Sequence, residues 1–140
     1  MKPQITQKFI DYLSHEIIGC AIEIHKEIGP GLLESAYENC LVYLLKKKGF
    51  KVESQVEVPI TFQGIVVDKA YRLDLLVENL VVVEIKSVSE FAPIHKAQML
   101  TYLKFKKVPK GILINFNCMN IFYEGQQTFI TKEYAKLSKE

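Results

Sequence analysis

The stretch YRLDLLVENLVVVEIKS, residues 71–87, decides the fold of this chain. Residues 80–87 form an apolar, β-branched run that is typical of a central strand buried on both faces. Residues 65–77 form a second strand-like run, and Glu78-Asn79 lies between the two, with Asn79 suited to a positive φ. The stretch therefore predicts two antiparallel strands joined by a tight turn.

Charged residues interrupt both strands where the pattern calls for apolar ones. Glu84 and Lys86 are two residues apart and project from one face, and each needs a partner if it is buried. A two-residue turn would place Asp74 opposite Ile85, with Glu84 on the other face. A three-residue turn, 78–80, would place Asp74 opposite Glu84, with Cβ atoms about 5 Å apart. In the second case the facing carboxylates suit a hard divalent ion such as Mg²⁺, and Lys86 could orient the attacking water. The simpler interpretation of Glu84 and Lys86 is a cross-strand salt bridge.

Working outward, apolar spacing of three and four predicts helices over residues 5–28, 32–48 and 93–107. Alternation predicts a strand over 51–62, which with 65–77 and 80–87 makes an antiparallel meander. A buried strand follows at 110–117. Short strands are expected at 120–123 and 128–130, paired around Glu124-Gly125, before a short polar helix or frayed tail at 132–140. The order α-α-β-β-β-α-β-β predicts an α/β sandwich with a mixed central sheet, in one domain over residues 1–140.

Composition excludes several classes of protein. Of 140 residues, 49% are hydrophobic and 24% charged, which are values of a globular domain. The longest apolar run, 17–22, is far shorter than the roughly 20 residues of a membrane span. No apolar core of signal-peptide length opens the chain, and three widely spaced cysteines form no metal or disulfide pattern, so we expect a cytoplasmic protein. The net charge of +2 neither demands nor excludes a nucleic-acid partner.

Two helices carry polar residues beside apolar faces. Glu34 shares a stripe with Tyr37 and Leu41 on the second helix, although an acid in the first turn also simply complements the helix dipole. His95, Gln98 and Tyr102 fall within about one quadrant of the third helix. Taken alone, that trio would be an ordinary polar flank.

Together these residues resemble a known nuclease superfamily. Asp74 followed by Glu84-Ile85-Lys86 resembles the PD-(D/E)xK signature, although Arg72-Leu73 stands where the literal Pro would precede Asp74. GLLESAY, residues 31–37, resembles the G-x-x-E-x-x-Y signature of small bacterial GxxExxY proteins. QMLTY, residues 98–102, matches the Q-x-x-x-Y motif of the recombination-exonuclease branch. The resemblance implies a restriction-endonuclease-like fold.

The resemblance also implies metal-dependent hydrolysis of phosphodiester bonds in DNA or RNA. Asp74 and Glu84 would bind Mg²⁺ or Mn²⁺ with the carbonyl of Ile85, and Glu34 would complete the acidic cluster. Lys86 would position the nucleophilic water. Gln98 and Tyr102 would hold the metal's water shell or the scissile phosphate.

Substrate contacts and alternatives stay open at this point. His95, Lys104 and Lys107 could contact phosphates, although lysine runs are usually solvated and His95 could equally be a packing residue. No membrane partner is expected, and a homodimer or a protein partner is left open. The alternatives to an enzyme are a catalytically silent nucleic-acid-binding or regulatory domain, and a structural protein whose acids are all salt-bridged.

Overall fold

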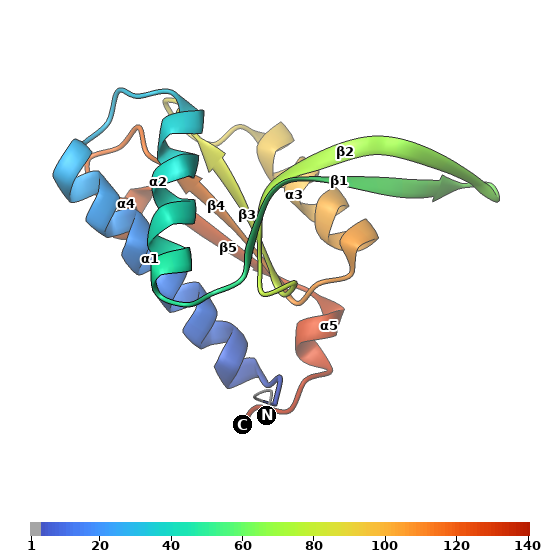
Figure 1. The fold of residues 1–140 in the computed structure, drawn as a ribbon. Coiled ribbons are helices and arrows are strands. Elements are labelled where there is room, and N and C mark those ends of the chain that lie inside the picture. Colours follow the sequence, from blue (N-terminus) through green and yellow to red (C-terminus); the bar gives the residue numbers. More distant parts are fainter. Residues whose placement is uncertain (1–3) are drawn as a thin grey trace.

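Five strands form one mixed sheet in the computed structural model of the chain, which describes residues 4–140 (Figure 1). The strand order follows the sequence, and helices cover the sheet, so the expected mixed α/β sandwich is confirmed. The elements are α1 (Gln7–Ile28), α2 (Glu34–Lys47), β1 (Val52–Phe62), β2 (Ile65–Val77), β3 (Val81–Lys86), α3 (Pro93–Lys106), β4 (Lys110–Asn115), α4 (Ile121–Glu124), β5 (Gln126–Ile130) and α5 (Lys132–Ala135).

The turn between β2 and β3 has three residues, which settles the register left open by the sequence. Val77 pairs with Val81 and Leu75 with Val83, so Asp74 lies in register with Glu84. Glu78 and Asn79 both adopt positive φ angles, 54° and 55°. β3 then pairs with β4 in parallel, through the crossover helix α3, and β5 returns antiparallel to β4.

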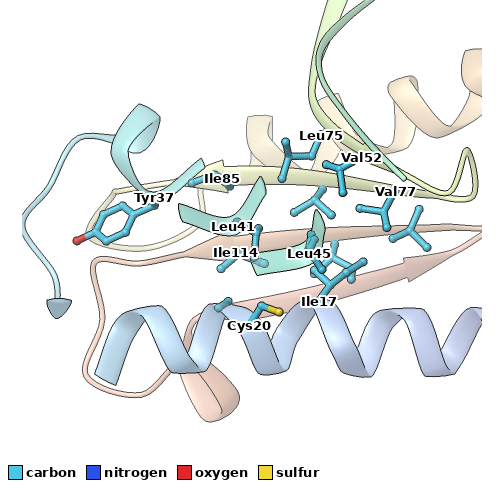
Figure 2. Close-up of a cluster of buried hydrophobic side chains, with 14 of the residues drawn as sticks. Ile17, Cys20, Tyr37, Leu41, Leu45, Val52, Leu75, Val77, Ile85 and Ile114 are labelled. Carbon is cyan, nitrogen blue, oxygen red and sulfur yellow. The ribbon is translucent and has the colours of Figure 1, made fainter. Parts of the chain in front are cut away.

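Two hydrophobic cores lie on opposite faces of the sheet. α1 and α2 cover one core, which includes Leu41, Leu45, Val83 and Ile85 (Figure 2). The smaller core lies under α3 and includes Val82. Since side chains alternate along a strand, Glu84 continues the Val82 side of β3 and belongs to the face covered by α3.

The outer part of the β1–β2 ribbon, residues 58–71, extends beyond the other strands as an arm (Figure 1). Where the ribbon leaves the sheet, the side chains of β2 pass from one core to the other. Leu75 packs in the α1–α2 core, whereas Leu73 packs in the α3 core. Gln55, which lies in register with Asp74, has a φ of 54°. Asp74 therefore sits at the point where the ribbon turns away from β3.

One expected strand is wrong. Residues 120–123 form no strand: Asn120 is the N-cap of the helical turn α4, which contains residues 121–123, and no hairpin forms around Glu124-Gly125. The Asn120 side chain accepts a hydrogen bond from the Tyr123 N–H, and the Glu124 carboxylate accepts from the N–H groups of Met119 and Asn120. These side-chain caps satisfy the backbone locally, which favours a helical turn over a ladder. Within residues 4–140, no helix has both the length and the apolar character needed to span a membrane.

Candidate active site

The candidate site forms where β2 and β3 part. Their ladder ends at the Leu75–Val83 pair, and the next two residues, Asp74 and Glu84, hydrogen-bond through their side chains instead. The Asp74 N–H donates to Glu84 Oε2 at 2.8 Å, and the Ile85 N–H donates to Asp74 Oδ2 at 2.8 Å. Each carboxylate thus accepts a hydrogen bond from a backbone N–H, as a carbonyl of the facing strand would if the ladder continued. These bonds hold both carboxylates in one orientation.

Burial makes both carboxylates resist ionisation. Glu84 is only 5% exposed, and burial, together with the negative charge of Asp74, raises its pKa to about 8. Burial also raises the pKa of Asp74, against the Ile85 hydrogen bond and the positive charge of Lys86, which lower it. Two acids kept at raised pKa values on one sheet edge are characteristic of sites that bind cations or transfer protons.

Glu34 reaches the same edge from the start of α2. Its Oε1 accepts a hydrogen bond from the Ser87 N–H at 3.2 Å, one residue beyond β3, and its charge contributes to the raised pKa of Asp74. The buried Tyr37 fixes the approach: its hydroxyl donates to the Gly29 carbonyl at 2.6 Å and accepts from the Leu32 N–H at 3.1 Å. Figure 2 shows this ring at the end of the core, with its hydroxyl directed away from the sheet.

A fourth acid, Glu38, was not anticipated from the sequence. It follows Glu34 by one helical turn, and its Oε1 accepts a hydrogen bond from Gln55 Nε2 at 2.7 Å. Burial, and then the charge of Asp74, raise the pKa of Glu38, and Glu38 in turn contributes to the raised pKa of Glu84. The signal available in the sequence was the spacing of four residues from Glu34, which places both acids on one face of α2.

Each of the four acids uses only one of its two carboxylate oxygens in hydrogen bonds from the described residues. Within residues 4–140, hydrogen bonds hold a single oxygen of each of Glu34, Glu38, Asp74 and Glu84. No fully buried side-chain nitrogen or oxygen in this part of the chain lacks a partner, and the second oxygen of each acid accepts no hydrogen bond from the described residues. As they stand, no three His, Cys, Asp or Glu side chains among the described residues are gathered closely enough to hold a metal ion. The donor chemistry nevertheless fits a hard divalent cation, which prefers oxygen ligands.

Lys86 ends β3 beside these acids. It is half-buried, its charge lowers the pKa values of both Asp74 and Glu84, and none of the ion pairs within 4.0 Å among residues 4–140 involves it. The backbone here is fixed: the Phe116 N–H donates to the Lys86 carbonyl at 3.0 Å. The buried Asn115 amide then bonds both the N–H and the carbonyl of Val88. The ammonium group is therefore close to the acids without being paired with one.

Of the two α3 residues expected at the site, Tyr102 is packed in place and Gln98 is not. Burial, followed by the charges of Glu84 and Asp74, raises the pKa of Tyr102, so its hydroxyl lies within electrostatic reach of the acids. Tyr102 stacks on Tyr71 with ring centroids 4.7 Å apart, and the Tyr71 hydroxyl donates to the Tyr102 carbonyl. Gln98 is exposed and makes no side-chain hydrogen bond within residues 4–140, although it lines a groove together with Tyr102.

The residues expected to contact phosphate are His95, on α3, and Lys104 and Lys107, near the C-terminal end of that helix. His95 Nδ1 accepts a hydrogen bond from the Ala92 N–H and so caps the start of α3. Lys104 and Lys107 are exposed and line a hollow beside β5 and α5. Their roles in binding substrate stay predictions.

The geometry agrees with a family comparison. Residues 11–127 match the profile of the PD-(D/E)XK nuclease superfamily, which covers most of the chain. The chain belongs to this superfamily. The superfamily generally uses divalent metal ions and acts on nucleic acids. That Asp74, Glu84 and Lys86 supply its signature stays a prediction.

The chain was also compared with solved structures and with curated proteins. The crystal structure of SSO0001 matches with 20% sequence identity and a TM-score of 0.49, over 93% of this chain and 67% of that one. No curated protein matches the sequence.

Proposed function

We propose that this member of the PD-(D/E)XK superfamily is a divalent-metal-dependent nuclease that hydrolyses phosphodiester bonds of DNA or RNA. The observation that carries the proposal is the pair Asp74 and Glu84. Both are fixed by backbone hydrogen bonds, both have raised pKa values, and each keeps one oxygen without a hydrogen bond from residues 4–140. A salt-bridged structural cluster would instead pair these acids with cations, and no such ion pair lies within 4.0 Å of either in residues 4–140.

The free carboxylate oxygens of Asp74 and Glu84 would hold Mg²⁺ or Mn²⁺, with the carbonyl of Ile85 and either Glu34 or Glu38 completing the protein ligands. When bound, such a cation stabilises negative charge on the phosphate and lowers the pKa of a coordinated water. Glu84 has to release its proton for this to happen, because a pKa of about 8 leaves it largely neutral at pH 7.

Lys86 would act on the water and on the phosphate. Its ammonium group is near the acids but unpaired, so it is free to orient a water molecule or to stabilise the charge that develops in the transition state. Tyr102, within electrostatic reach of Glu84, and the exposed Gln98 one turn earlier would contact the metal's water shell or the scissile phosphate. From the sequences of residues 31–37 and 98–102, the chain is further proposed to be a GxxExxY protein that carries the Q-x-x-x-Y motif of the recombination-exonuclease branch.

The experiment is incubation of the purified chain with labelled single- and double-stranded DNA and RNA in Mn²⁺, beside two lysine variants. Lys86→Ala should lower the cleavage rate by a factor of about 10² to 10³. Lys136→Ala, an exposed residue after α5, is the matched control and should cleave like wild type. Cleavage by Lys86→Ala at the wild-type rate would contradict the proposal.

The alternative is a nucleic-acid-binding or regulatory domain that has kept the fold without turnover. The absence of a ready-made metal cluster among residues 4–140 is the observation that favours it. Mn²⁺ raises the melting temperature in both cases if the acids bind it. The alternative predicts that none of the four labelled substrates is cut, even though nucleic acid is bound.

A further inference from the structure

A groove of about 350 Å³ runs between the arm and α3. The rings of Tyr71, Tyr102 and Phe105 line it, together with the side chains of Gln98 and Thr101. Stacking of Tyr71 on Tyr102, and the hydrogen bond from the Tyr71 hydroxyl to the Tyr102 carbonyl, fix the base of the arm against the helix. The groove is therefore a built feature with aromatic side chains and a polar edge.

The groove lies near the candidate site. Tyr102 lies both in the groove and within electrostatic reach of Glu84 and Asp74. Along β2, Tyr71 precedes Asp74 by three residues, a distance of about 10 Å. A ligand in this groove would thus lie within one or two nucleotides of a phosphate held by the acids.

Charge distinguishes this groove from the other apolar one. No acidic residue lines this groove, and α3, which forms one wall, carries three lysines outside the lining, Lys96, Lys104 and Lys106, and no acidic residue. By contrast, the groove of about 320 Å³ between α1 and α2 is lined by Glu23 and Glu27. A polyanion is attracted to the first surface and repelled by the second.

We propose that the groove between the arm and α3 binds one unpaired nucleobase of the substrate, next to the scissile phosphate. This inference rests on the proposed function and narrows its substrate to single-stranded or locally unpaired nucleic acid. Aromatic side chains bind bases of any sequence by stacking, and Gln98 and Thr101 offer hydrogen bonds to a base edge. A volume at the lower end of the range for small-ligand sites, roughly 300–1,000 Å³, suits one base and not a segment of duplex.

The test fills the groove from an exposed position. Ala97 lies on the exposed side of α3 and lines the groove, so Ala97→Trp should block it without disturbing a core. The matched control is Leu100→Trp, also exposed on α3 but outside this groove. Fluorescence anisotropy in EDTA measures binding of a labelled oligothymidylate, an abasic strand of equal length and a matched duplex, without turnover.

Ala97→Trp should weaken oligothymidylate binding about tenfold, and wild type should prefer oligothymidylate to the abasic strand by a similar factor. Leu100→Trp should bind like wild type. Equal affinity of Ala97→Trp and wild type for oligothymidylate would overturn the proposal, as would equal affinity of wild type for the abasic strand.

Light scattering after gel filtration tests another occupant. A wild-type dimer that Ala97→Trp converts to monomer would also overturn the inference, because the groove would then hold the exposed arm tip, Phe62 and Ile65, of a second copy. Failure of the proposed function remains distinguishable. If the chain binds oligothymidylate through the groove but never cleaves it in Mn²⁺, the base-binding site is supported and the nuclease function is contradicted.

Discussion

Glu84 should make the metal-free protein less stable as the pH rises, and Glu84→Gln should remove most of this dependence, leaving the smaller part due to Asp74 and Glu38. The pKa of Glu84 is about 8 in the folded chain, compared with 4.5 for an ordinary glutamate side chain. Between these two values the native state holds a proton that the unfolded chain has released. Stability therefore falls as the pH rises through this window and levels off above pH 8.

The size of the effect follows from linkage. Each pH unit inside the window costs about 1.4 kcal/mol, so the free energy of unfolding should drop by roughly 3 kcal/mol between pH 5 and pH 7. For a chain of this length, that corresponds to a fall in melting temperature of roughly 10 °C. Thermal melts in EDTA across this range measure it. Mn²⁺ should reverse the loss at pH 7, because the cation binds the ionised carboxylate.

Glu84→Gln isolates the titrating group. The amide oxygen of Gln can still accept the hydrogen bond from the Asp74 N–H, so the variant keeps the fold and loses only the titration. Glu57→Gln, an exposed residue of β1, is the matched control and should melt like wild type at every pH. Parallel pH dependence in wild type and Glu84→Gln would refute the reasoning.

Three further substitutions test the site and its support. Glu38→Gln should weaken Mn²⁺ binding about tenfold, measured by calorimetry, with the melting temperature in EDTA unchanged or raised; unchanged Mn²⁺ affinity would remove Glu38 from the site. Tyr37→Phe should cost about 1–3 kcal/mol in urea unfolding, because two hydrogen bonds to its hydroxyl are lost, and a wild-type midpoint would contradict this. Gly111→Ala should cost about 1–3 kcal/mol, since the added Cβ would lie 2.5 Å from Met99 Sδ; a stable variant would show that α3 can shift.

Much of the fold could be predicted because its strongest signals are local. The mostly apolar run Val81–Lys86 and the turn residues before it, Glu78 and Asn79, are consecutive in the sequence. The three-residue turn alone puts Asp74 in register with Glu84. The resemblance of Asp74, Glu84 and Lys86 to the superfamily signature pointed to the same edge of the sheet, and the family comparison confirmed the superfamily.

The rest depends on contacts between distant parts of the chain. Glu38 joins the site only because the ribbon turns at Gln55 and brings β1 against α2, a bend that alternation along β1 does not indicate. Residues 120–123 look like a strand by composition, but the carboxylate of Glu124 caps a helical turn there. The arm is likewise invisible in the sequence, because pairing of β1 with β2 says nothing about where β3 stops.

Between β2 and β3, two carboxylates accept hydrogen bonds that backbone carbonyls would accept in a continuous ladder. This arrangement affects which residues evolution can replace. Asp74 and Glu84 each satisfy a backbone N–H that the parted strands leave without a ladder partner. A lineage that no longer cleaved nucleic acid would still lose folding free energy by mutating either acid to an apolar residue. Selection for a stable sheet is therefore enough to preserve both acids. The Lys86 side chain has no acceptor and satisfies no backbone N–H, so under the proposed function its replacement would mark a loss of catalysis earlier than replacement of either acid.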